Sequence, residues 1–283
     1  HGLLVVPVPE LDDDNHVLLS SLDATVMQHG AEFNLGLHKY QGNNYSPTGH
    51  KYIREFYCDK VPTTVYRVGG VLLKKEVVFQ HYEDRILIRY TLLDAHSETT
   101  LRFRPFLAFR SVRQFTHENS VASREYHEVD NGIRTCMYAG YPDLYMQFSK
   151  KNEFVFCPDW YRGVEYTKEQ ERGYASNEDL YVPGYFEMNI KKGESIVFSG
   201  STSPIHTSGL KSLFEKRWRS ARRATTSSIA WSMPHISSTR GRKTAKTDTS
   251  WPATRGSSAA HAIRSYRCPG SPLPSTSRII SRW

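Results

Sequence analysis

The 283 residues of this chain suffice for one large or two ordinary domains. Its formal net charge of +8 would ordinarily point to nucleic acid or an anionic membrane as a partner. The charge is unevenly distributed, however: residues 217–283 hold 13 Lys and Arg and one acidic residue, whereas residues 1–216 hold 24 basic and 28 acidic residues. The part with a foldable pattern is therefore mildly acidic, and we expect neither nucleic acid nor a membrane as its partner.

No apolar run reaches the roughly 18 residues of a membrane-spanning helix, and the N-terminus lacks the pattern of a signal peptide. The chain begins at His1, so we expect that its natural start is missing. The cysteines form no CxxC pair, and therefore no zinc site, other metal site, disulfide framework or cofactor is predicted. Scattered thiols fit a reducing cytoplasm; they are Cys58, Cys136, Cys157 and Cys268.

Residues 1–216 consist of short strand-like segments that follow one another and are separated by turn residues. Gly69-Gly70 separates the segments 63–68 and 71–79, and two glycines supply the positive φ angles of a tight hairpin turn. Asn131-Gly132 marks a second hairpin. Strands that follow one another through short turns pair antiparallel, so an all-β, antiparallel β-sandwich is predicted. Its further strands are expected at 85–92, 101–109, 133–138, 145–148, 153–156 and 195–199.

Helical signals are few. Residues 166–173 are predicted as a short helix that Gly173 ends. A second helix is expected at 208–216, of the kind that links domains. The run Asp12-Asp13-Asp14 lacks the spaced oxygen ligands of a calcium loop, and it is predicted as a solvated turn between segments 3–6 and 17–19.

The segment Asp159-Trp160-Tyr161-Arg162 has residue types that suit a carbohydrate site. The apolar face of a pyranose ring can stack on Trp160 or Tyr161, while Asp159 and Arg162 can hydrogen-bond to its hydroxyls. The alternative is that Trp160 belongs to the core, because aromatic rings dominate cores as well. These four residues are the predicted substrate-binding residues.

Glycoside hydrolases use a pair of carboxylates, but no pair stands out here, and most acidic side chains are solvated. No HExxH, GxSxG or P-loop motif occurs. The sequence therefore predicts no catalytic residue. The carboxylates considered are Glu165, Glu169, Glu171, Glu178, Asp179 and Glu187.

Several motifs, in order and spacing, resemble the N-terminal domain of bacterial and archaeal glycogen debranching enzymes, which are amylo-α-1,6-glucosidases. The chain opens on HGLL, and residues 104–110 resemble the RPFLA-type strand of that family. The other matching segments are 30–33, 40–42, 160–161 with Glu169, 172–173, 178–180 and 183–186. The resemblance covers about residues 1–216.

The resemblance implies a β-supersandwich that binds or frames an α-glucan such as glycogen. It also implies a following (α/α) toroid, which holds the catalytic carboxylates, packs on the sandwich and hydrolyses α-1,6 branch linkages. Nothing beyond residue 216 has the pattern of a helical toroid. We therefore expect a fragment in which residues 1–216 form the sandwich domain and the catalytic domain is missing.

Residues 217–283 carry no strand or helix period; 22 of these 67 residues are Ser or Thr. A disordered basic tail fits this composition, but four of the five tryptophans lie here, namely Trp218, Trp231, Trp251 and Trp283. If the gene is read one base earlier from about Lys216, residues 253–263 permit GYPWFKCRARD and the residues through Gly270 permit TFISLPG. That string resembles the start of the family's catalytic toroid, so residues 217–283 are predicted to be a frameshifted, disordered tail.

Two alternatives remain at this point. A nucleic-acid-binding protein would use the basic tail, although the tail contains no recognised binding module. A stand-alone sugar-active β-sandwich enzyme would need paired carboxylates, which the sequence does not reveal. The basic residues of the first alternative are Arg217, Arg219, Arg222, Arg223, Arg240, Arg242 and Lys243.

Overall fold

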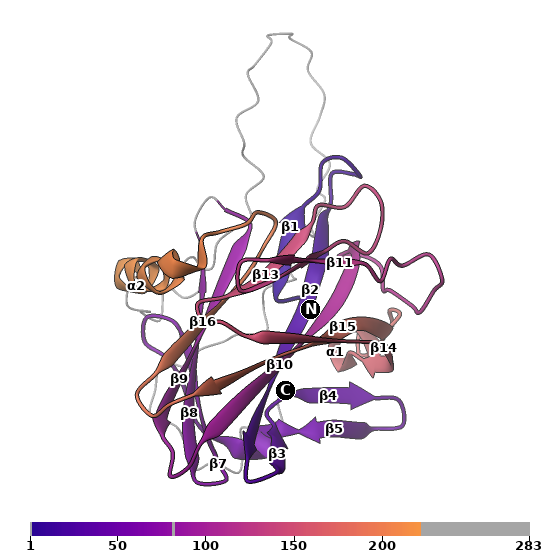
Figure 1. Ribbon diagram of the computed structural model, residues 1–283. Coiled ribbons are helices and arrows are strands. Elements are labelled where there is room, and N and C mark those ends of the chain that lie inside the picture. The colour runs from indigo at the N-terminus through magenta and orange to yellow at the C-terminus, as the bar shows by residue number, and fades with distance from the viewer. Residues whose placement is uncertain (1, 81–82, 222–283) are drawn as a thin grey trace.

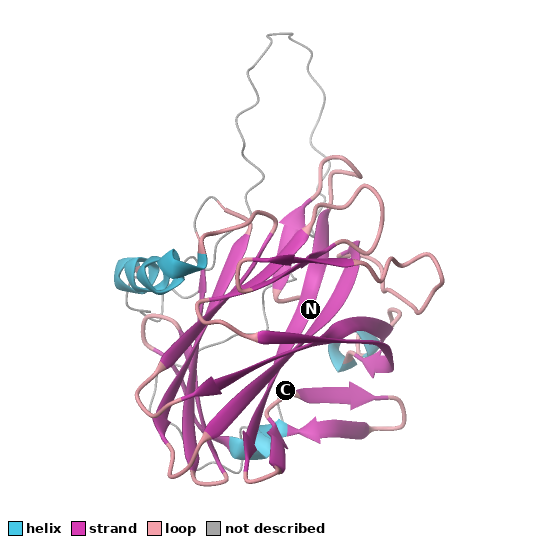
Figure 2. Ribbon diagram, in the orientation of Figure 1, coloured by secondary structure: helices cyan, strands magenta, loops and turns pink. Residues whose placement is uncertain are grey.

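A computed structural model describes residues 2–80 and 83–221, which form two antiparallel eight-stranded sheets (Figures 1 and 2). The predicted all-β antiparallel sandwich is confirmed. The first sheet has the order β1-β2-β10-β15-β14-β4-β5, with β3 paired to β2. Its strands are β1 (Leu4–Pro7), β2 (Asn15–Gln28), β3 (Ala31–Asn34), β4 (Leu37–Tyr40), β5 (Asn44–Thr48), β10 (Thr99–Ser111), β14 (Glu153–Glu165) and β15 (Asn177–Ile190).

The second sheet has the order β11-β12-β13-β16-β9-β8-β7-β6. Its strands are β6 (Ile53–Cys58), β7 (Pro62–Val68), β8 (Val71–Phe79), β9 (Arg85–Asp94), β11 (Tyr126–Val129), β12 (Gly132–Thr135), β13 (Leu144–Phe148) and β16 (Ser195–Ser201). The described helices are short: η1 (Gly49–Tyr52), α1 (Thr167–Gln170), η2 (Thr207–Gly209) and α2 (Leu210–Ser220). In the part of the chain that the structure describes, no helix has the length and apolar character needed to cross a membrane.

The predicted hairpin of segments 63–68 and 71–79 is confirmed as β7 and β8. Gly69 and Gly70 join these strands with φ angles of 54° and 79°, which a glycine adopts without strain. Strand β14 runs much further than the predicted segment 153–156, and it includes the residues 159–162 that were singled out as a carbohydrate site. Two β-bulges, between Phe156 and Asp159 and between Tyr161 and Val164, interrupt its pairing with β15.

The main core lies between the two sheets. Phe148 on β13 is fully buried there, and its ring lies 5.1 Å from Phe103, 5.0 Å from Phe186 and 5.2 Å from Phe198, measured between centroids. These rings come from β10, β15 and β16, so a single side chain ties strands of both sheets together.

Helix α2 covers the outer face of the second sheet (Figure 1). Leu210 and Phe214 pack on apolar residues of β8, β9 and β16, and Arg89 of β9 forms ion pairs with both Glu76 and Glu215. The helix continues past the predicted domain boundary at residue 216. Arg217 Nε donates to the carbonyl of Phe79 at 2.6 Å, and the Lys60 ammonium lies 4.6 Å from the ring centroid of Trp218. Residues 222–283, most of the predicted tail, lie outside the described residues.

A smaller apolar cluster lies on the outer face of the first sheet, beneath β4. The His38 ring lies 4.7 Å from the ring of Phe106, and His38 Nε2 lies 2.8 Å from Asp23 Oδ2. Burial lowers the pKa of His38, but the charge and hydrogen bond of Asp23 outweigh burial, so the net pKa is raised. Both side chains are buried, and their contact joins β4 to β2.

We predict that Phe148→Ala lowers the free energy of unfolding by about 3–5 kcal/mol, because it leaves a cavity among three aromatic rings. Urea unfolding followed by circular dichroism measures the change. Tyr174→Ala is the matched control, since Tyr174 is 69% exposed. A loss below about 1 kcal/mol in Phe148→Ala would contradict the packing.

We also predict that part of the stability depends on the protonation of His38. A raised pKa means that the His38–Asp23 contribution is fully present below the unfolded-state pKa of about 6.5 and is lost as the pH rises through the higher folded-state pKa. In His38→Gln, the fall of the unfolding free energy above pH 6.5 should therefore be shallower than in the parent. The exposed His127→Gln serves as control, and equal slopes in parent and His38→Gln would refute the prediction.

Candidate functional site

A polar groove of about 460 Å³ lies where β14 and β15 meet the end of β4. Val164 of β14 pairs with Tyr40 of β4, and the amide of Gln41 donates to the carbonyl of Gly163 at 3.3 Å. These contacts bring together segments more than 120 residues apart in the sequence. The groove is lined by Tyr40, Gln41, His117, Arg162, Gly163, Asn177 and Asp179.

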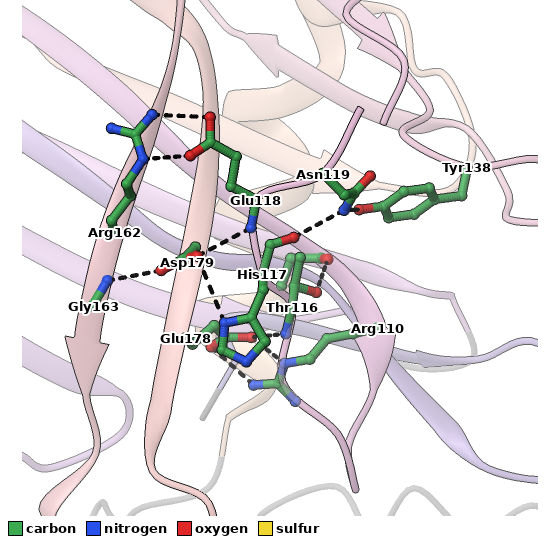
Figure 3. Close-up of polar contacts among 11 residues, drawn as sticks. Arg110, Thr116, His117, Glu118, Asn119, Tyr138, Arg162, Gly163, Glu178 and Asp179 are labelled. Atoms are coloured by element: carbon green, nitrogen blue, oxygen red, sulfur yellow. Dashed lines mark hydrogen bonds and ion pairs between the residues drawn. The ribbon is translucent and has the colours of Figure 1, made fainter. Parts of the chain in front are cut away.

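Asp179 lines this groove and contacts Gly163, His117 and Glu118, as Figure 3 shows. Its Oδ1 accepts a hydrogen bond from the amide of Gly163 at 2.8 Å, and its Oδ2 accepts one from the amide of Glu118 at 3.0 Å. His117 Nδ1 lies 3.6 Å from Oδ2. Gly163 has φ +70° at the second bulge of β14, a conformation that favours glycine and that accompanies the approach of its amide to Asp179. The carboxylate is thus held in place by main-chain donors and retains free lone pairs.

An ion pair crosses one side of the groove. Arg162 on β14 holds Glu118 through two hydrogen bonds, Nε to Oε2 and Nη2 to Oε1, the latter at 2.9 Å. The hydrogen bond from Arg162 is the main cause that lowers the pKa of Glu118. Both side chains are well exposed, so this pair adds little stability. It sets the position of the guanidinium, whose remaining N–H groups can donate to a ligand.

The neighbour of Asp179 in the sequence anchors the same strand on its other face. Glu178 has no exposed surface and forms a bidentate ion pair with Arg110 of β10, in which Nη2 lies 3.2 Å from Oε2. The hydroxyl of Tyr166 donates to Glu178 at 2.5 Å, and the amide of Thr116 donates to it at 3.4 Å. Burial is the main cause that raises the pKa of Tyr166, with Glu178 adding to it. The Thr116–Asn119 segment is thereby attached to the outer face of the sheet.

Two further groups complete the hydrogen-bonding capacity of the groove. Asn177 Oδ1 is buried and accepts no hydrogen bond from any described residue, a state that costs about 1–3 kcal/mol unless a partner arrives. Burial first, and then Tyr161 and Asp23, raise the pKa of Tyr40 to about 12, so its hydroxyl remains a donor at neutral pH. The groove is thus lined by hydrogen-bond acceptors, on Asp179 and Asn177, and by hydrogen-bond donors, on Arg162 and Tyr40. That combination suits a neutral ligand rich in hydroxyl groups.

The structure separates the four residues that the sequence grouped. Arg162 lines the groove. Trp160 is 5% exposed and lies in the main core beside Tyr181, as the alternative interpretation held. Tyr161 packs edge-on against Phe106 on the outer face, and Asp159 is exposed, with Oδ1 accepting from the amide of Trp160. A role of these four in binding glucan stays a prediction.

Sequence reasoning did not single out the groove as a site. The sequence points to Asp179 as one of six carboxylates and as part of the family-like segment 178–180, and to Tyr40 and Gln41 as part of the family-like segment 40–42. The signal that could have found Asp179 is its alternation with the buried Glu178 on one strand, which turns adjacent side chains to opposite faces.

Buried carboxylates of the described part are all engaged. Asp23 pairs with His38, Glu76 with Arg89, and Glu178 with Arg110. Within residues 2–80 and 83–221, no three His, Cys, Asp or Glu side chains gather in a group that could hold a metal ion. The site therefore offers hydrogen bonds and shape to a ligand, and the described residues do not present a free pair of carboxylates from the core.

We predict that Glu178→Gln lowers the free energy of unfolding by about 3–5 kcal/mol, because it leaves the guanidinium of Arg110 buried without its counter-charge. Chemical unfolding measures this effect. Glu171→Gln, which removes a carboxylate from an exposed ion pair with Lys168, should change stability by less than about 1 kcal/mol. Equal effects of the two substitutions would show that the buried pair does not support the groove.

Comparison with known proteins gives a family. A model of the glycogen debranching enzyme N-terminal domain matches residues 1–197, whereas no curated protein matches the chain. Among solved structures, a bacterial glucoamylase complexed with acarbose has a TM-score of 0.33 at 7% sequence identity. The match covers 73% of this chain and 32% of the glucoamylase chain. A polysaccharide lyase has a TM-score of 0.26 at 11% sequence identity, and the match covers 70% of this chain and 27% of the lyase chain. This chain thus spans a third or less of each of those structures. Because the family model covers well over half of the chain, the protein belongs to the glycogen debranching enzyme N-terminal family.

Proposed function

We propose that residues 1–221 are the first domain of a glycogen debranching enzyme and that they contact an α-glucan through the Asp179 groove. The family match over residues 1–197 carries this proposal. The chemistry of the groove supports it, since a fixed carboxylate, an unsatisfied amide oxygen and a guanidinium can bind the hydroxyls of a glucosyl unit. Hydrolysis of α-1,6 linkages would be carried out by a separate (α/α) toroid in the full-length enzyme.

The domain boundary moves from residue 216 to residue 221 in this proposal. Arg217, Trp218 and Ala221 all contact the sandwich or α2, which is the behaviour of residues that are part of the domain. We place the proposed frameshift after Ala221, beyond these contacts, and not near Lys216. Sequencing of the source DNA tests it: confirmed bases there, together with stop codons in the shifted frame before the end of the chain, would refute the frameshift.

Neither alternative function is proposed. The described residues give no observation that favours nucleic-acid binding, and Arg217 of the basic segment is already bound to the carbonyl of Phe79. A stand-alone hydrolase would need two carboxylates placed for acid and nucleophile or base, whereas each buried carboxylate of the described part is engaged by an Arg or His side chain.

We predict that Asp179→Asn and Asn177→Ala each weaken the affinity of the full chain for maltoheptaose or glycogen at least about tenfold, as expected when a hydrogen bond to a fixed acceptor is lost. Isothermal titration calorimetry with maltoheptaose and affinity electrophoresis in glycogen measure this. His127→Ala, an exposed change on β11, is the control. Unchanged affinity in both groove variants would remove the groove from the proposal.

We further predict that the pure chain releases no glucose from a branched dextrin under conditions in which it binds the glucan. The physical reason is that hydrolysis requires a carboxylate pair at a set separation. A coupled glucose assay provides the measurement. Robust release that survives further purification would overturn the assignment as a non-catalytic domain while leaving the binding result intact.

A further inference from the structure

A second pocket lies at the other sheet, well apart in sequence from the residues of the groove. It has a volume of about 170 Å³. It is lined by the ends of β6, β7, β8 and β9 and by the loop after β9. The lining residues are Arg54, Arg67, Gly70, Val71, Leu72, Asp94 and His96.

The lining side chains form a row across the sheet. Arg67 of β7 is opposite Leu72 of β8, and Leu72 is opposite Asp94 of β9. Arg54 lies in the bulge of β6 between Ile53 and Glu55, which pair with Tyr66 and Val65, the two residues that precede Arg67. Bulges redirect side chains, and here two arginines of neighbouring strands line the same pocket.

The positive charge of this pocket is not balanced within the described part of the chain. Asp94 pairs with Lys192, which does not line the pocket: Lys192 Nζ lies 2.6 Å from Asp94 Oδ1, and the hydrogen bond and charge of Lys192 are the main causes that lower the pKa of Asp94. Arg67 forms no ion pair with any described carboxylate. Arg54 has only the weak contact with Glu55, at 3.4 Å between two half-exposed side chains.

Like charges on adjacent strands repel each other, and two guanidinium groups that face one pocket are the donors that bind a tetrahedral oxyanion with two hydrogen bonds each. His96 is a third donor at the same rim. We propose that this pocket is a binding site for a phosphate group, either inorganic phosphate or the phosphate ester of a sugar. The site is independent of the Asp179 groove and of the proposed glucan binding.

The test measures anion binding by the full chain and by two variants with the same net charge. Inorganic phosphate is titrated at constant ionic strength against chloride, with the melting temperature and ³¹P line width as readouts. Arg67→Gln should weaken phosphate binding at least about tenfold, since it removes a charge-assisted donor. Arg113→Gln removes an exposed arginine that pairs with Asp14 and does not line the pocket, and it should change phosphate binding less than about twofold. The basic residues beyond 221 are common to all three proteins, so their contribution cancels in the comparison.

Glucose 6-phosphate in place of inorganic phosphate distinguishes the two sources. Tighter binding of the ester, lost in Arg67→Gln, assigns the site to a sugar phosphate; equal binding of both anions assigns it to the phosphate group alone. Arg54→Gln should reproduce the loss seen in Arg67→Gln. Phosphate binding that is equal in the parent and Arg67→Gln, or no stronger than the effect of chloride, would overturn the proposal.

Discussion

The ion pair between Glu178 and Arg110 is the interaction on which the outer face of the first sheet depends. It lies between β15 and β10 with no exposed surface on the carboxylate, and it also receives the hydroxyl of Tyr166 and the amide of Thr116. A buried charge is tolerated only when its partners are complete. The four groups therefore constrain one another, and the loop that carries His117 and Glu118 follows from their arrangement.

The groove is lined by Asp179, the residue that follows Glu178 on β15. Glu178 lies on the outer face of the first sheet, where Tyr166 and Thr116 bind it, whereas Asp179 lies on the other face of β15, because successive residues of a strand face opposite ways. One carboxylate thus binds the sheet together, while the next is free to receive a ligand. Glu178 is anchored in the sheet by Arg110, and Asp179 is bonded directly to it along the backbone. The position of Asp179 relative to the sandwich is therefore constrained.

The sequence predicted the architecture better than the site. The Gly69-Gly70 hairpin, the strands near 101–109 and 195–199, and the short helix near 167 all follow from local turn and alternation patterns. Strand β15 was missed, since its residues are mixed in polarity and include Pro183-Gly184, and the bulges of β14 were invisible. The groove requires Tyr40, Arg162 and Asp179 to meet, and such long-range strand pairing leaves no trace in a local pattern. Trp160 illustrates the limit: residue type alone does not distinguish an aromatic ring that faces the core from one that faces a ligand.

The way in which Asp179 is held determines which substitutions around it are tolerated. Both of its hydrogen bonds come from main-chain amides, those of Gly163 and Glu118, and every residue except proline supplies such an amide. Position 118 can therefore change its side chain without releasing the carboxylate, and position 163 is limited by its backbone angle rather than by its chemistry. The position of the Asp179 carboxylate is therefore insensitive to most side-chain changes at position 118, whereas it depends on Asp179 itself and on a residue that tolerates a positive φ at position 163.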